Sequence, residues 1–421
     1  MNSKNTMISS KIGFLLIALT ISVQYSSAQL PAVSEMAKSY PFVNKELNVI
    51  SNQEQLSGLM EKLYLQKKSG DQKINILHIG DSHLQADFET SVIRTTLQKE
   101  FGNSGRGLIV PYRVAKTNEP FNYKTSSTYL WQNKRCVFPN LPLPIGIGGV
   151  TISSKDSCAA FTIFAKNDSL LNYGFNKVTL FYQKDSASYN FALIDSLGNR
   201  LGTINKDTIN NQIFTSSASF PSFVNKITVQ LMKSEEQNKQ ATIYGVLLEN
   251  GNPGISYHTI GVNGAQYLHY SEARYFAEQT KALKPDLITV SLGTNEAYAL
   301  NFKQEQFYAD IQLLYCKLKQ ENPNVPFLFT TPACSYRRKK PNPRLPLAAK
   351  TIIQFANDNN LSYWDLQGVT GGDNSAVNWK KNRLLRPDGV HYSKVAYELQ
   401  GTLFCQAFFN SFNAYAANRP Q

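Results

Sequence analysis

The chain has 421 residues, of which 42% are hydrophobic and 17% are charged, and its formal net charge is +13 at pH 7. This length is enough for two domains, and the composition is that of a folded globular protein, not of an extended disordered chain. A basic protein favours anionic surroundings. The basic residues are scattered, however, apart from the run Arg337–Lys340, so we expect no nucleic-acid partner.

The first 28 residues have the pattern of a secretory signal peptide. Lys4 and Lys11 give a positive start, residues 13–23 form an apolar run, and Ser26–Ala28 is a small-residue cleavage site. The apolar run is short for a membrane span, which favours cleavage over the alternative of an uncleaved anchor. The sequence therefore predicts an exported protein, periplasmic or extracellular, without stable membrane insertion.

The five cysteines are an odd number and include no C-x-x-C spacing, which argues against a structural zinc site. In an oxidising compartment Cys136 and Cys158 could pair. Cys316 and Cys405 lie in apolar helical patterns, which are typical of buried thiols.

The chain begins, after the signal peptide, with an α/β pattern. An amphipathic helix is predicted over residues 53–68 because its leucines fall on one face. A buried strand over residues 74–79 ends at Gly80, and a helix is expected from there to about Phe101. From about Arg113 helical periodicity fades.

Short β-rich runs separated by turn signals follow. These runs are residues 159–164, 177–182, 189–194 and 226–232. They predict an inserted all-β sandwich that ends at about Tyr244.

The α/β pattern then resumes. The predicted strands are residues 256–260, 287–292, 326–330 and 361–366, and the predicted helices are residues 265–283, 302–320, 347–357 and 394–409. Strands that alternate with helices indicate a parallel sheet with helices on both faces. The predicted order is therefore a signal peptide (1–28), the first part of an α/β domain (29–112), a β-rich insert (113–244) and the second part of the α/β domain (245–421).

Polar segments follow the predicted strands of the α/β domain. They are residues 80–83, 261–264, 293–296 and 388–391. In open parallel sheets functional groups gather at the carboxyl ends of the strands. We therefore expect these segments to meet at one edge of the sheet.

The segments carry the residue types of a serine nucleophile and its base. The hydroxyl of Ser82 needs a base to take its proton, and the base needs a third group to hold its tautomer. Asp388 and His391 are three residues apart, so one turn could orient the imidazole toward Ser82. The oxyanion formed on attack needs fixed donors, for which the backbone N–H groups of Ser82 and Gly264 and the amide of Asn295 are candidates.

In order and spacing, these segments resemble the four blocks of the SGNH (GDSL-like) hydrolase family. The matching positions are Gly80-Asp81-Ser82, Gly264, Gly293-Thr294-Asn295 and Asp388-x-x-His391. The resemblance covers about residues 74–110 and 245–412. It implies a flavodoxin-like three-layer α/β/α domain and an esterase, lipase or carbohydrate deacetylase activity, with no metal and no other cofactor.

A narrower resemblance is to peptidoglycan O-acetylesterases, in which a β-rich, carbohydrate-binding-like module interrupts the SGNH domain. The Gly-Asp-Ser-His form of residues 80–83 and the run Gly261–Ala265 fit that subgroup. His83 replaces the leucine of plain GDSL enzymes, which argues against lipid hydrolysis by analogy. The resemblance implies that an acyl-enzyme on Ser82 releases acetate from an acetylated glycan, most of all cell-wall peptidoglycan.

Several alternatives stay open at this point. The same triad could transfer the acyl group to a sugar, or act on another polysaccharide such as xylan. A metallophosphoesterase would need convergent metal ligands, and the chain has five histidines and no His-x-His. A glycan-binding protein with a decayed site is a more distant alternative. No pattern indicates the oligomeric state.

Some residues near the predicted triad have open roles. Asp81 and His83 are candidates for supporting positions beside it. The basic run Arg337–Lys340 follows a predicted strand near the site, where it could attract an anionic glycan or simply form a solvated loop. Tyr129 or Trp131 in the insert could stack on sugar rings, although aromatic residues are more often part of a core.

Overall fold

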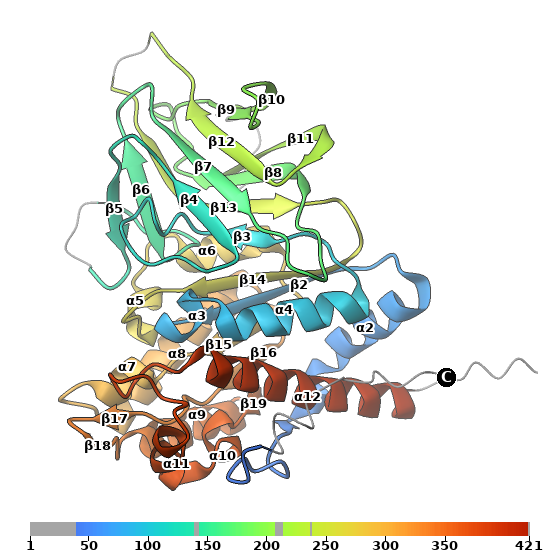
Figure 1. Ribbon diagram of the computed structural model, residues 1–421, viewed down its shortest axis with the longest axis vertical. Helices are drawn as coiled ribbons and strands as arrows, with labels where there is room; N and C mark the ends of the chain where they lie inside the picture. Colours follow the sequence, from blue (N-terminus) through green and yellow to red (C-terminus); the bar gives the residue numbers. More distant parts are fainter. Residues whose placement is uncertain (1–38, 139–142, 207–213, 236–237, 420–421) are drawn as a thin grey trace, which may run out of the picture.

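The computed structural model describes residues 39–138, 143–206, 214–235 and 238–419, so the predicted signal peptide at residues 1–28 lies outside the described part of the chain. Figure 1 shows an α/β region of helices around a sheet, and a second region made of strands that lies next to it. Within the described ranges, none of the helices combines the length and apolarity that a bilayer crossing requires.

The α/β region is built on a six-stranded sheet. Its strands, in spatial order, are β1 (Ile50–Ser51), β19 (Ser362–Trp364), β16 (Phe327–Thr330), β15 (Leu287–Ser291), β2 (Lys73–Gly80) and β14 (Gly254–Gly261). All pairs are parallel except that of the short β1 with β19. Counted along the chain, the parallel strands have the flavodoxin-like order 2-1-3-4-5, which places a topological switch point between β2 and β15.

Helices cover both faces of this sheet. They are α2 (Ser57–Ser69), α3 (Ser82–Gln85), α4 (Phe88–Phe101), α5 (Tyr267–Ser271), α6 (Phe276–Thr280), α7 (Thr294–Tyr298), α8 (Gln304–Glu321), α9 (Leu345–Asp358), α10 (Leu366–Val369), α11 (Ser375–Lys381) and α12 (Lys394–Asn418). Short 3-10 turns occupy Gln53–Leu56, Lys281–Leu283 and Gly372–Asn374.

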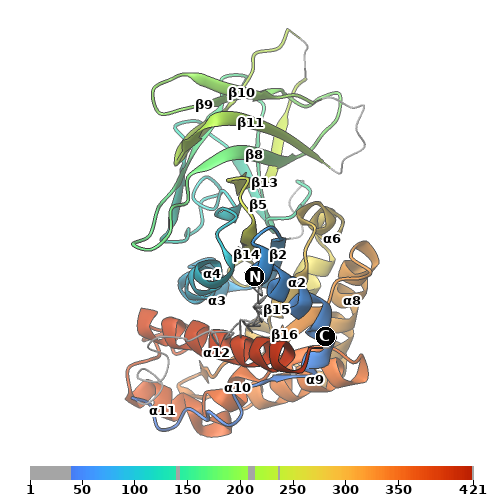
Figure 2. The ribbon, with the colours of Figure 1, turned by 90° about the vertical axis from the view of Figure 1, so that its right-hand side faces the viewer.

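The two faces follow from the alternation of side chains along the strands. In β2, Ile74 and Ile76 pack with α2, α4 and α12, whereas Leu77 and Ile79 pack with the group that contains α5, α6, α8 and α9. Figure 2 shows the sheet between these two helical layers. The predicted α/β class, with a parallel sheet covered on both faces, is confirmed.

The predicted helix 265–283 is wrong as a single element. The chain forms α5, a turn, α6 and a 3-10 turn instead. The break coincides with a contact to a distant segment, because the backbone N–H of Tyr275 donates to the carbonyl of Ile145, from the β-rich region, at 2.9 Å. The helix expected up to Phe101 is also divided, at Asp87, whose φ of 59° lies in the left-handed region.

Between α4 and β14 the chain forms two antiparallel sheets. One has the order β10 (Arg200–Ile204), β9 (Phe191–Ile194), β12 (Lys226–Leu231), β7 (Ala160–Ala165) and β4 (Tyr123–Ser126). The other has the order β11 (Thr215–Val224), β8 (Phe175–Tyr182), β13 (Ala241–Glu249), β6 (Val150–Ser154) and β5 (Gln132–Arg135), with β3 (Gly107–Ile109) paired to β13. Inward-facing residues such as Phe161, Leu180 and Val229 share one apolar core. β3 lies before the predicted insert (113–244) and β13 runs past its end, and the domain boundaries stay a prediction.

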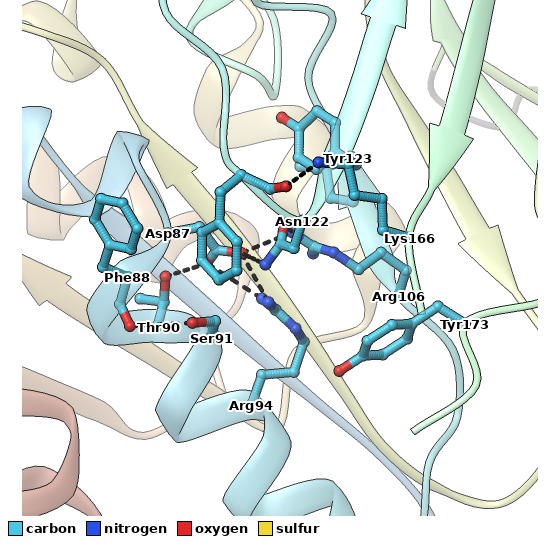
Figure 3. A network of polar contacts seen from close by, with 12 residues as sticks. Asp87, Phe88, Thr90, Ser91, Arg94, Arg106, Asn122, Tyr123, Lys166 and Tyr173 are labelled. Atoms are coloured by element: carbon cyan, nitrogen blue, oxygen red, sulfur yellow. Dashed lines mark hydrogen bonds and ion pairs between the residues drawn. The ribbon is translucent and has the colours of Figure 1, made fainter. Parts of the chain in front are cut away.

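A buried charge network joins the β-rich region to α4 (Figure 3). Asp87, directly before α4, accepts from Arg94 at 2.7 Å and from Arg106 at 2.8 Å, and all three side chains are only 1% exposed. The amide of Asn122, directly before β4, also donates to Asp87. Burial alone would raise the pKa of Asp87, but the two guanidinium groups outweigh it and lower the pKa to about 2. The carboxylate therefore stays charged and holds the two regions together.

The β-rich region also covers the outer edge of β14. The backbone N–H of Leu108 donates to Nδ1 of His258 at 3.2 Å, and that of Gly261 donates to the hydroxyl of Tyr112 at 3.1 Å. An uncovered edge would present unpaired backbone groups. Because Gly261 ends β14, the second contact also fixes the start of the polar segment 261–264.

All five cysteines are free thiols, and Cys136 and Cys158 are not bonded to each other. Cys405 is buried, as the apolar pattern of its helix predicts. The prediction is wrong for Cys316, which is exposed. In α8 the buried positions include Leu314 and Leu318, and Cys316 lies between them on the opposite side of the helix.

Candidate active site

Ser82 lies where β2 ends and α3 begins. A Cβ atom at Gly80 would stand 2.5 Å from the side chain of Leu84, so the close approach of helix and strand requires a glycine there. Asp81 caps the helix, because its Oδ1 accepts the backbone N–H of His83 at 2.9 Å. The turn leaves Ser82 half-buried at the carboxyl end of β2, beside the switch point of the sheet.

The imidazole of His391 connects the two ends of the chain. Its Nε2 lies 3.0 Å from Oγ of Ser82, and its Nδ1 lies 2.9 Å from Oδ2 of Asp388. The structure thus brings the three predicted triad residues together, although 309 positions separate Ser82 from His391. This is the geometry in which a serine hydroxyl can be deprotonated by a histidine that a carboxylate orients.

A compact turn holds Asp388 and His391. The backbone N–H of Arg386 donates to the carbonyl of His391 at 2.8 Å, and Gly389 has a left-handed φ of 72° that glycine accepts without strain. Partial burial would by itself raise the pKa of Asp388, but the backbone N–H of Val390 and the hydrogen bonds from His391 outweigh it and lower the pKa. The carboxylate therefore stays charged at neutral pH, as the predicted orienting role requires.

The predicted oxyanion donors lie at the ends of the neighbouring strands. Gly264 follows β14 with a φ of 82°, and Asn295 lies in the first turn of α7, after β15. The Nδ2 of Asn295 donates to Oδ2 of Asp81 at 3.1 Å and to the carbonyl of Ala265 at 2.9 Å. The asparagine thus ties the nucleophile and glycine segments together. An oxyanion hole formed by Ser82, Gly264 and Asn295 stays a prediction, since both amide hydrogens of Asn295 have acceptors within the protein.

His83 packs directly beneath the triad. Its ring centroid is 5.5 Å from that of His391, and its Nδ1 lies 2.9 Å from the hydroxyl of Tyr397. Burial lowers the pKa of His83 to about 3, and the nearby His391 lowers it further. The ring is therefore neutral. Its Nε2 has no hydrogen-bond partner among the residues that the structure describes, and His83, Asp81 and Glu89 line a cavity of about 30 Å³. Supporting roles for Asp81 and His83 stay predictions.

Sequence reasoning missed a polar contact between the β-rich region and the site. The side chain of Gln85 in α3 accepts the backbone N–H of Asn263 at 2.7 Å and donates to the carbonyl of Asn118 at 2.5 Å. Val137 lies 3.9 Å from the position that a Cβ of Gly264 would occupy. Isolated glutamine and asparagine residues give no periodic signal, so only the fold reveals that the β-rich region borders the glycine segment.

Comparisons with known proteins show a similarity to acylhydrolases. Residues 228–399 match the GDSL-like Lipase/Acylhydrolase family, a range that includes the glycine, asparagine and aspartate–histidine segments but not Ser82. No curated protein matches the chain. Among solved structures, a peptidoglycan O-acetylesterase superposes with a TM-score of 0.70 at 21% identity, over 89% of this chain and 98% of its own.

Two other solved structures resemble a smaller part of the chain. A lipase/acylhydrolase from Enterococcus faecalis has a TM-score of 0.31 at 20% identity, over 37% of this chain and 77% of its own. The acetyl xylan esterase AlAXEase has a TM-score of 0.29 at 19% identity, over 36% of this chain and 81% of its own.

The acylhydrolase family match, together with a fold that superposes along most of the chain, defines a serine esterase. The predicted resemblance to the SGNH (GDSL-like) hydrolase family is confirmed, with the acylhydrolase match over residues 228–399 and the superposed fold as its support.

Proposed function

We propose that this protein is a secreted carbohydrate O-acetylesterase whose substrate is cell-wall peptidoglycan. The observation that carries the proposal is the 3.0 Å contact between Oγ of Ser82 and Nε2 of His391. It occurs in a chain whose fold, β-rich region included, is similar to that of a peptidoglycan O-acetylesterase over 89% of its length. The signal-peptide pattern of residues 1–28 supports export to the compartment where such a substrate lies.

The reaction follows from the contacts of the three residues. His391 takes the proton of Ser82 as the hydroxyl oxygen attacks the acetyl carbonyl, and Asp388 stabilises the resulting imidazolium. His391 then gives the proton to the departing sugar oxygen, which leaves an acetyl group on Ser82. A water molecule, deprotonated by the same imidazole, attacks this ester and releases acetate.

The developing charge needs fixed donors. The backbone N–H groups of Ser82 and Gly264 and the amide of Asn295 come from three adjacent strand ends, and they are the groups that we assign to the oxyanion. For Asn295 this requires its amide to turn from, or to share, the acceptors on Asp81 and Ala265.

The accessibility of the triad fits a polymeric substrate. The side chain of His391 is 38% exposed and that of Asp388 is 50% exposed. An acetyl group on a long glycan can reach such an open site without threading the chain through a tunnel. Asn118 and Val137 extend the border of the site onto the β-rich region, which would give a sugar chain additional surface to contact.

Acetate release tests this proposal. The purified protein is incubated with O-acetylated peptidoglycan and, separately, with acetylated xylan, and free acetate is measured. We expect faster release from peptidoglycan, and none from either substrate with Ser82→Ala. Faster release from xylan would contradict the proposed substrate, and the absence of release from both would contradict the esterase itself.

A further inference from the structure

A basic hairpin stands beside the proposed active site. Strands β17 (Tyr336–Arg337) and β18 (Lys340–Pro341) form it, and Arg338 and Lys339 make its turn. The hairpin follows β16, the strand next to β15. It therefore lies at the carboxyl ends of the strands, as Ser82 and Asn295 do. Figure 1 shows β17 and β18 beside α7.

Hydrogen bonds attach the hairpin to two parts of the site. The backbone N–H of Tyr336 donates to the carbonyl of Gly389, in the turn that carries Asp388 and His391, at 2.6 Å. On the other side, Nε of Arg337 donates to the carbonyl of Tyr298 at 2.9 Å. Tyr298 ends α7, the helix whose first turn contains Asn295. The hairpin therefore spans the rim between the histidine turn and the asparagine helix.

The charge on this rim is not compensated. Arg338, Lys339 and Lys340 are exposed, and among the residues that the structure describes, no hairpin side chain takes part in an ion pair. Of the carboxyl groups nearby, Asp388 pairs with His391. Glu296 is buried, and burial raises its pKa to about 8, which keeps it largely neutral at pH 7.

The turn of the hairpin has an unusual sequence for its conformation. Arg338 and Lys339 have φ values of 49° and 65°, both in the left-handed region. Two-residue turns with this conformation favour Asn-Gly or Asp-Gly, because other side chains are strained there. Here two long basic side chains occupy the strained positions, at the exposed tip of the hairpin. Strained backbone conformations cluster at functional sites.

We propose that this basic hairpin binds carboxylates of the glycan substrate, so that the esterase prefers acetylated glycans that carry carboxylates over neutral ones. This inference rests on the proposed function and names its substrate class. Arginine presents a planar fork that matches a carboxylate, and lysine adds a mobile point charge. The carboxylates can belong to peptides attached to the sugar or to acidic sugars, since both offer the same group.

Two matched triple variants test the hairpin. One is Arg338→Gln/Lys339→Gln/Lys340→Gln, in which glutamine keeps an unbranched side chain at the left-handed positions and removes only the charge. The control is Lys68→Gln/Lys99→Gln/Lys284→Gln, which removes the same charge from exposed residues. The three control lysines lie near the amino ends of β2 and β15, at the edge of the sheet opposite the triad.

The substrates are also matched. Soluble O-acetylated peptidoglycan fragments are used with free carboxylates and after carbodiimide amidation of those carboxylates. The ratio of kcat/KM for the free form to that for the amidated form measures charge recognition. We expect a ratio of roughly 10 for the unmodified protein at low salt, a fall toward one in the hairpin variant, and no such fall in the control. The same comparison with acetylated polygalacturonate separates acidic sugars from attached peptides as the source of the carboxylates.

The outcomes separate this inference from the proposed function. If the unmodified protein releases acetate equally well from the free and amidated fragments, or if the hairpin variant keeps the full ratio, the hairpin does not recognise carboxylates and the esterase proposal is unaffected. If the unmodified protein releases acetate from neither form, the proposed function itself fails. Added salt should lower the ratio of the unmodified protein, because the contact is exposed to solvent.

Discussion

The side-chain amide of Asn295 donates to the carboxylate of Asp81 across 3.1 Å and so joins the strand ends of β15 and β2. The other carboxylate oxygen of Asp81 accepts the backbone N–H of His83 and caps the helix that begins at Ser82. One buried side chain thus contacts both the helix that begins at Ser82, the predicted nucleophile, and Asn295, a predicted oxyanion donor. Burial raises the pKa of Asp81 to about 7, while the N–H of His83 and the nearby His391 act in the opposite direction.

We expect Asp81→Asn to lower kcat while leaving KM nearly unchanged. Asparagine keeps the shape of the side chain, but its NH2 group donates where a carboxylate oxygen of Asp81 accepted. If this NH2 group faces Asn295, two donors meet, and the amide of Asn295 loses its fixed position. A displaced oxyanion donor typically costs roughly 100-fold in kcat. Steady-state kinetics with an aryl acetate measure the effect, with the exposed Glu305→Gln as control. An unchanged kcat would show that Asp81 does not position the donor.

The triad makes a separate prediction. Asp388→Asn should lower kcat by roughly 10⁴-fold, because an amide cannot hold His391 in the required tautomer or stabilise its charged form. Ser82→Ala should abolish turnover and acyl-enzyme formation. Both residues are partly exposed, so thermal unfolding should stay close to that of the unmodified protein. Retention of an acetylated protein in Ser82→Ala, detected by mass spectrometry, would point to a different nucleophile.

The charge network around Asp87 predicts a large effect on stability. Asp87→Asn leaves Arg94 and Arg106 buried without their counter-ion, which should lower the free energy of unfolding by about 3–5 kcal/mol. Asparagine tolerates the left-handed backbone of this position, so the loss reports on charge. Urea denaturation measures it, with Glu305→Gln as a control expected to change stability by less than about 0.5 kcal/mol. A similarly small change for Asp87→Asn would contradict the role given to the network.

Glu296 makes stability depend on pH. Burial raises its pKa to about 8, against the opposing hydrogen bond from the backbone N–H of Tyr267. The folded protein therefore keeps a proton that the unfolded chain releases at lower pH, and this group lowers stability as pH rises from about 4 to about 8. Glu296→Gln should remove that contribution and flatten the stability curve by up to about 1.4 kcal/mol per pH unit. Parallel curves for the two proteins would contradict the assignment.

The parts of the fold that local sequence determines could be predicted. Buried parallel strands appear as continuous apolar runs, and three strand ends carry the polar segments 80–83, 261–264 and 293–296, whereas segment 388–391 follows α11. Because parallel strands share a direction, the first three segments could be predicted to lie together, and the resemblance of Asp388-x-x-His391 to the last SGNH block added His391 to them.

The remaining features depend on contacts between distant segments. The break near Tyr275 coincides with a hydrogen bond to Ile145, and no helical pattern records the position of a carbonyl in another region. The same holds for Gln85, whose partners Asn118 and Asn263 come from two other parts of the chain. The exposure of Cys316 could not be predicted, because aromatic and aliphatic residues on other sides of the same helix make the sequence around it apolar.

The cover over the outer edge of β14 has a consequence for how the protein can be shortened. A catalytic fragment from which residues 103–249 had been deleted would lose the hydroxyl of Tyr112 at the edge of β14, and it would lose the amide of Asn122 that donates to Asp87. Such a fragment would offer open backbone groups along a long strand, which promotes association with other chains. The two regions should therefore unfold together as one cooperative unit, although the chain enters and leaves the β-rich region through separate connections.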